Sequence, residues 1–171
     1  MFGKYLKLFL LVSTLFVSGY SFSIGEIGNG IFLFFIAAIF VLLYFRNENI
    51  IIAFYHLRKG DMVKAEKALD KIKQPEYLVK GQQAYYYFLR GIMDSQTRSL
   101  GKAESALRKA LNIGLRNDSD KAMAKLNLAG IAMNKRRKRE ATSLLAEAKK
   151  LDKRNMLDEQ LKMMKQQLKR I

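Results

Sequence analysis

The chain of 171 residues has no cysteine and no tryptophan, and it has one histidine and one proline. The absence of cysteine excludes disulfides, thiolate metal sites and cysteine nucleophiles. The single histidine, His56, has no second histidine or cysteine with which to share a metal ion, so we expect a packed or surface side chain. No glycine-rich phosphate loop or nucleophile motif is present. We therefore expect no enzymatic activity, no cofactor and no metal.

Acidic residues are also scarce, since 31 Lys and Arg residues face 15 Asp and Glu residues and give a net charge of +16. From Lys121 to the end of the chain the counts are 15 bases and 5 acids. A field of this sign attracts anionic lipid headgroups, RNA or acidic protein surfaces. The densest basic run is predicted to be an exposed turn between two helices: Lys135, Arg136, Arg137, Lys138 and Arg139. A solvated loop, a lipid contact worth about 1 kcal/mol per base and an RNA phosphate contact remain alternatives for this run.

Two apolar stretches near the N-terminus, residues 5–22 and 27–45, approach the roughly 20 residues that a membrane-spanning helix needs. They predict a transmembrane helical hairpin over residues 1–46. The bases Lys4, Lys7 and Arg46 then favour an inner or plasma membrane location with both termini and the following domain in the cytoplasm. The alternative is that residues 1–20 are a cleaved signal peptide. No glycine or proline interrupts residues 31–59, which predicts one helix running from the second span into the next domain.

An internal repeat with a period of 38 residues organises the rest of the chain. The segment Lys64–Leu69 reappears as Lys102–Leu107 and, more loosely, as Glu140–Leu145. A period in this range is typical of stacked helical repeats. The sequence therefore predicts an all-α fold, in which an α-solenoid of three helix pairs over residues 47–154 follows the hairpin. The pairs are expected at 47–79, 84–117 and 119–154, and the apolar stripe of residues 155–171 predicts a capping helix, with a coiled-coil seam as the alternative.

These repeats resemble the tetratricopeptide repeat (TPR) family. Ala and Leu recur four residues apart at 65/69, 103/107 and 141/145, and the middle repeat adds Tyr87 and Gly91 at the aromatic and small positions. Arg90 departs from the pattern by replacing the usual Leu, and the period exceeds the 34 residues of the family.

The resemblance implies an apolar concave groove lined by the first helix of each pair, which would accept a helix or a neighbouring subunit. The principal positions that it assigns to this groove are Phe54, Leu57, Tyr85, Phe88, Ile92, Met123, Leu126 and Met133, and it also places Asn47, Ile50, Ser95 and Gly130 on this face. The groove lacks the basic residues with which some relatives hold an acidic peptide terminus. We expect a membrane-anchored adaptor or accessory subunit of a membrane protein assembly. A tether for an RNA-containing particle such as the ribosome and a homo-oligomeric scaffold are the alternatives, and the C-terminal helix could itself fill the groove.

Overall fold

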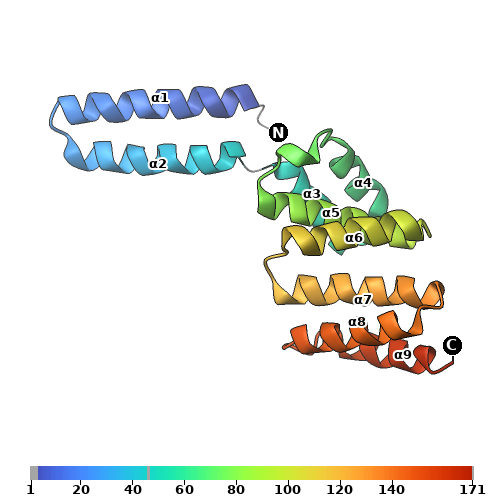
Figure 1. Ribbon diagram of the computed structural model, residues 1–171. Helices are drawn as coiled ribbons and strands as arrows, with labels where there is room; N and C mark the ends of the chain where they lie inside the picture. Colours follow the sequence, from blue (N-terminus) through green and yellow to red (C-terminus); the bar gives the residue numbers. More distant parts are fainter. Residues whose placement is uncertain (1–3, 46, 171) are drawn as a thin grey trace. The chain divides into compact units, whose positions relative to one another are not determined.

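A computed structural model of the chain describes residues 4–45 and 47–170, and within these ranges all regular elements are helices (Figure 1). The all-α prediction is therefore confirmed. The chain divides between Glu48 and Asn49 into two units, which are described separately below.

The first unit is a hairpin of α1 (Lys4–Ser23) and α2 (Ile27–Phe45), with Gly25 at a φ of +82° in the turn. Small side chains let the two helices approach closely. The Ser18 hydroxyl is buried and donates to the carbonyl of Gly30 at 2.8 Å. A Cβ at Gly30 would lie 2.9 Å from the Phe22 ring, so a larger side chain at this position would have to displace the ring.

Large apolar side chains remain exposed on both helices of the hairpin, among them Phe9, Phe16, Phe32 and Phe35. Within the described ranges, however, no helix combines the length and the apolar character required to cross a membrane. In α1 the apolar residues are interrupted by Ser and Thr, and the uninterrupted apolar part of α2 is only residues 31–45. At 1.5 Å per residue that part is about 22 Å long, shorter than a hydrocarbon core of about 30 Å. The predicted transmembrane hairpin, and the inner-membrane location inferred from it, are wrong.

The predicted continuous helix over residues 31–59 is also wrong. Helix α2 ends at Phe45, Asn47 is not helical, and α3 begins at Glu48. The absence of glycine and proline therefore did not suffice to keep this stretch helical.

The second unit is a stack of antiparallel helix pairs followed by one more helix. The first pair is α3 (Glu48–Arg58) with α4 (Met62–Asp70), the second is α5 (Lys80–Gln96) with α6 (Leu100–Ile113), and the third is α7 (Asp118–Asn134) with α8 (Lys138–Leu151). Figure 1 shows α5, α6, α7 and α8 following one another down the stack, with α9 (Asp158–Leu168) beside α8. A short 3₁₀ helix, η1 (Pro75–Tyr77), separates α4 from α5, because proline removes a backbone donor.

The repeated residues form equivalent parts of the core. In the second helix of each pair the repeated Ala and Leu side chains are buried: Ala65, Ala103, Ala141, Leu69, Leu107 and Leu145. Within the middle pair, α5 and α6 approach so closely that a Cβ at Gly91 would lie 2.6 Å from the Cγ atom of Leu107. The period of 38 residues thus has a packing cause, since each small or branched side chain recurs where two helices meet.

Arg90, which departs from the TPR pattern, has a structural role on α5. Its guanidinium lies 3.0 Å from the carboxylate of Asp70 on α4 and 3.7 Å from that of Asp94 on its own helix. A leucine at this position could not make these ion pairs between the first and second helix pairs.

Candidate functional site

The predicted groove is largely filled by the protein's own packing. Phe88 and Ile92 on α5 and Leu126 and Met133 on α7 are buried, and Phe88 is only 1% exposed. Phe88, Ile92 and Met133 therefore belong to the core and are not available to a partner in this structure, and Leu126 is covered except where it borders the pocket described below.

The other four of the principal groove residues lie nearer the surface. Phe54 on α3 and Met123 on α7 are exposed, at 38% and 37%, and Leu57 is half-buried. Tyr85 is also half-buried, and its hydroxyl donates to Asp120 at the start of α7. Burial raises the pKa of Tyr85 above its ordinary range, and the Asp120 carboxylate raises it further. Tyr85 thus joins α5 to α7 and stays a neutral hydrogen-bond donor.

Helix α9 covers the face of α7 on the third pair. Leu157, Leu161 and Leu168 form one buried cluster with Leu126 and Met133. The apolar stripe of the C-terminal segment is therefore covered within the chain; its last predicted member, Ile171, lies outside the described residues. The sequence left open whether the groove is filled or free. It is filled where α9 packs on α7, and it is free at the exposed side chains of Phe54 and Met123.

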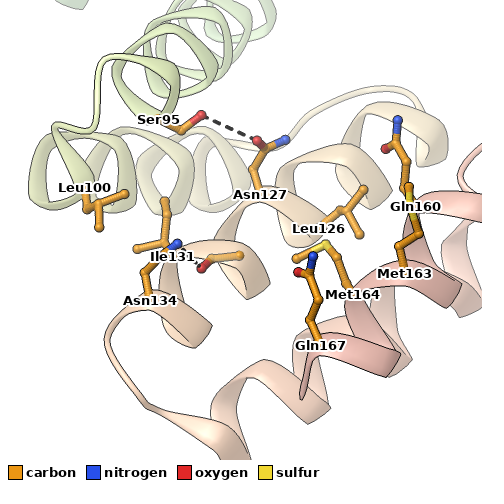
Figure 2. Close-up of a pocket in the computed structure, with 11 residues that line it drawn as sticks. Ser95, Leu100, Leu126, Asn127, Ile131, Asn134, Gln160, Met163, Met164 and Gln167 are labelled. Carbon is orange, nitrogen blue, oxygen red and sulfur yellow. Dashed lines mark hydrogen bonds between the residues drawn. The ribbon is translucent and has the colours of Figure 1, made fainter. Parts of the chain in front are cut away.

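Where α9 leaves α7 uncovered, a pocket of about 400 Å³ opens between α5, α6, α7 and α9 (Figure 2). Gly130 is one of its lining residues, and a Cβ there would lie 3.3 Å from the Cε atom of Met164. The pocket is lined by Ser95, Leu100, Leu126, Asn127, Gly130, Ile131, Asn134, Gln160, Met163, Met164 and Gln167.

The pocket combines amide groups with apolar side chains and has no charged side chain in its lining. The Asn127 and Asn134 amides donate to the carbonyls of Met123 and Gly130, each at 2.9 Å, so their orientations are fixed. Gln160 and Gln167 are exposed on α9, and their side-chain amides make no hydrogen bond to any other residue that the structure describes. Amides that both donate and accept can bind a polypeptide backbone, which also carries one donor and one acceptor per residue.

Of these residues, the TPR resemblance had assigned Ser95, Leu126 and Gly130 to the groove. Gln160, Met163 and Gln167 each precede a stripe residue of α9 by one position. Residues adjacent to a buried stripe flank it on one side of a helix, so a helical wheel of α9 would have indicated this second, polar edge.

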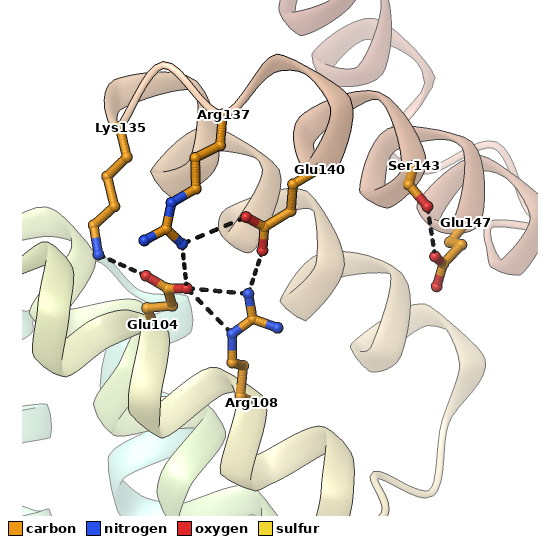
Figure 3. A network of polar contacts seen from close by, with 7 residues as sticks. All are labelled: Glu104, Arg108, Lys135, Arg137, Glu140, Ser143 and Glu147. Atoms are coloured by element: carbon orange, nitrogen blue, oxygen red, sulfur yellow. Dashed lines mark hydrogen bonds and ion pairs between the residues drawn. The ribbon is translucent and has the colours of Figure 1, made fainter.

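The predicted basic run divides into two sets with different roles. Glu104, at the start of α6, accepts from Lys135 at 2.6 Å and from Arg137 at 3.1 Å (Figure 3). Arg108 on α6 pairs with Glu104 at 3.0 Å and also with Glu140 on α8. These five residues join the second helix pair to the third.

The charges of this network also act on Glu104 itself. Its carboxylate is 15% exposed, and hydrogen bonds from Lys135 and Arg108 together with the charges of Lys135 and Arg137 lower its pKa from 4.5 to about 2, against the opposing effect of burial. Lys135 and Arg137 are thus engaged in the fold. The side chains of Arg136, Lys138 and Arg139 are exposed and make no ion pair within the described ranges.

The residues that the structure describes include no group of three or more His, Asp or Glu side chains placed to hold a metal ion. His56 on α3 is half-buried, and its ring lies edge-to-face with that of Tyr55 at 5.6 Å.

Comparisons with known proteins found no relative. No protein-family model matches the chain, and neither a curated protein nor a solved structure is significantly similar to it.

Proposed function

We propose that this chain is a non-enzymatic protein-binding module that holds a short, uncharged segment of another protein in the pocket between α5, α7 and α9. The observation that carries the proposal is the composition of that pocket: four amide side chains and two methionines line a volume of about 400 Å³ without a charge. Binding pockets of this size are usually apolar with a few placed polar groups. Methionine adapts its shape to different partner side chains.

We also propose that the helix pairs are TPR-like repeats. Support comes from the equivalent burial of the repeated Ala and Leu side chains and from the close approach at Gly91, the small position of the middle repeat. Repeats of this kind commonly present binding surfaces on their stacked helices. The apolar surface of the α1–α2 hairpin is a second feature that indicates interaction, because exposed apolar patches mark surfaces that a partner covers.

The pocket assignment can be tested with peptides displayed from a random library and selected on the full chain. We expect the selected peptides to be uncharged at their centre. Gln167→Glu places a carboxylate in the pocket lining. A bound uncharged peptide would cover this charge and leave it without a partner, so the substitution should weaken peptide binding at least tenfold. Gln166→Glu is the matched control, because Gln166 is an exposed neighbour on α9 that does not line the pocket.

A crosslinking experiment gives an independent map of the contact. A photoreactive amino acid at Met163, on the exposed side of the pocket, should crosslink to a selected peptide. The same group at Met156, which is exposed but lies before α9 and outside the pocket lining, should not. Equal binding to both glutamate variants, or equal crosslinking from both positions, would show that the pocket is not the binding site.

A further inference from the structure

The three turns that join the helices within each pair share one conformation, and its central residues are 38 positions apart. Gly60, Arg98 and Arg136 have φ values of +80°, +60° and +57°. After each of them, the next backbone N–H donates to a carbonyl five residues earlier: Asp61 to His56, Ser99 to Asp94, and Arg137 to Ala132. This is the Schellman pattern of a helix C-terminus, which glycine favours at the left-handed position.

Two of these three positions carry arginine instead of glycine. The other left-handed residues that the structure describes are Gly25, Gly114 and Asn155, residue types that adopt this conformation readily. For Arg98 and Arg136 the conformation costs about 1 kcal/mol each relative to glycine. Backbone strain of this kind concentrates at functional positions. At both strained turns the residue is an arginine, whose side chain carries a guanidinium group.

The two turns lie on the same edge of the stack. Lys135 and Arg137, on either side of Arg136, bind Glu104 at the start of α6, and that helix begins two residues after Arg98. Further bases follow in the first turns of α6 and α8. Five cations of this edge make no ion pair with any residue in the ranges 4–45 and 47–170, and we call them the basic edge: Arg98, Lys102, Arg136, Lys138 and Arg139.

We infer that the basic edge binds the phosphate backbone of a nucleic acid, without selecting its bases. Three of its five cations are arginines, whose planar guanidinium fits phosphate oxygens with two parallel hydrogen bonds. No aromatic ring and no exposed large apolar side chain lies in residues 97–102 or 135–139. A protein partner normally requires such an anchor at the centre of its interface, whereas contacts to phosphate require charge alone.

The same strain supplies a test in which binding and stability change in opposite directions. The full chain carrying Arg98→Gly and Arg136→Gly should melt at a higher temperature than the wild type, because both turns lose their strain. Each phosphate contact to a single strand raises the binding constant by roughly the salt concentration to the power −0.7, which is about fivefold at 0.1 M salt. Because the variant loses two such contacts, its affinity for a labelled 20-nucleotide poly-U RNA should fall about 25-fold at this salt concentration. The slope of log affinity against log salt should become shallower by about 1.4.

The matched control is Arg116→Gly with Arg154→Gly, which removes the same charge from two exposed arginines. These lie in the loops that follow α6 and α8, at the opposite edge of the stack, where Lys153 pairs with Asp118 at 3.3 Å. We expect less than a threefold loss of RNA affinity for this control. A poly-A RNA and a poly-T DNA of the same length should bind the wild type within a few-fold of poly-U.

Equal losses in the two double variants would overturn the inference, as would a lower melting temperature of Arg98→Gly with Arg136→Gly. Polyglutamate of the same charge as the RNA is the second ligand. If it bound the wild type as tightly as the RNA does, and if its affinity fell as much in this variant, the basic edge would instead be a binding site for an acidic protein. Because the basic edge and the pocket share no residue, failure of one proposal leaves the other standing.

Discussion

The position of α9 depends on one buried carboxylate, and its removal should release this helix from the stack. Asp152, at the end of α8, is buried and accepts from the backbone N–H of Leu157 at 2.7 Å and from that of Met156 at 3.0 Å. These bonds close the turn that returns the chain from α8 into α9. The substitution Asp152→Ala removes both acceptors at once.

The expected cost can be worked out from the two contacts. Hydrogen bonds to a charged group contribute about 1.5–3 kcal/mol each. Met156 is exposed, so water can replace its lost acceptor, whereas the N–H of Leu157 remains buried and unpaired. We therefore expect a loss of about 3 kcal/mol in the docking of α9. That corresponds to a roughly 100-fold increase in the open population, at 1.4 kcal/mol per factor of ten.

Hydrogen exchange measured by mass spectrometry would detect this change locally. Peptides covering residues 158–168 should exchange about 100-fold faster in Asp152→Ala, while peptides from α5 and α6 should keep their protection. Asp158→Ala is the control, since Asp158 is a half-buried residue of α9 that pairs with the exposed Lys162 at 2.8 Å, and ion pairs at the surface contribute about 0–1 kcal/mol. Unchanged exchange of α9 in Asp152→Ala, or equal acceleration through the whole unit, would refute the reasoning.

Four further substitutions test the packing and the ion-pair network. Gly91→Ala places a Cβ 2.6 Å from Leu107 and should lower the free energy of unfolding by about 1–3 kcal/mol in urea denaturation, and a variant as stable as the wild type would contradict the close contact. Because the pKa of Glu104 is lowered from 4.5 to about 2, its ionised form should stabilise the fold above pH 4.5, and this contribution should be lost between pH 4.5 and 2. The contribution of the ionised Glu104 to the free energy of unfolding is at most about 3 kcal/mol and about half that after screening by solvent. The substitution Glu104→Gln should remove this contribution from the acid dependence of the melting temperature. Phe88→Asp should abolish the helical circular dichroism of the stack, because it buries a charge. Phe54→Asp should leave the signal within a few per cent of the wild type, since Phe54 is exposed, and similar spectra for the two variants would show that Phe88 is not a core residue.

The repeat period was the part of the sequence that predicted most of the fold. It located the helix pairs because the repeated Ala and Leu side chains are fixed by contacts within one pair. Local signals at the pair boundaries were also informative. Proline disfavours the interior of a helix, and Pro75 begins η1 between α4 and α5. Asn, Asp and Ser favour the start of a helix, and α7 begins at Asp118 within the polar cluster of residues 117–120.

The role of that cluster could not be predicted, because it depends on a residue far away in the sequence. The Asn117 side chain does not cap α7. Its amide instead donates to the Tyr85 hydroxyl at 3.2 Å and to Asp120 at 3.0 Å, which joins α7 to α5. The pocket was missed for the same reason, since its walls come from four helices and its shape depends on where α9 returns to the stack.

The basic run shows why the density of charge in a sequence overestimates the charge that a partner meets. Five consecutive bases suggested a uniform patch, but the left-handed turn at Arg136 sends its two neighbours toward Glu104 and leaves Arg136 itself exposed. The partner of Lys135 and Arg137 is more than 30 residues earlier in the chain. The turn conformation that separates these roles is the same one that places Arg98 at the equivalent position of the second pair. The basic edge therefore follows from the repeat, because it combines exposed cations from two equivalent turns. No single segment of the sequence contains all of its residues.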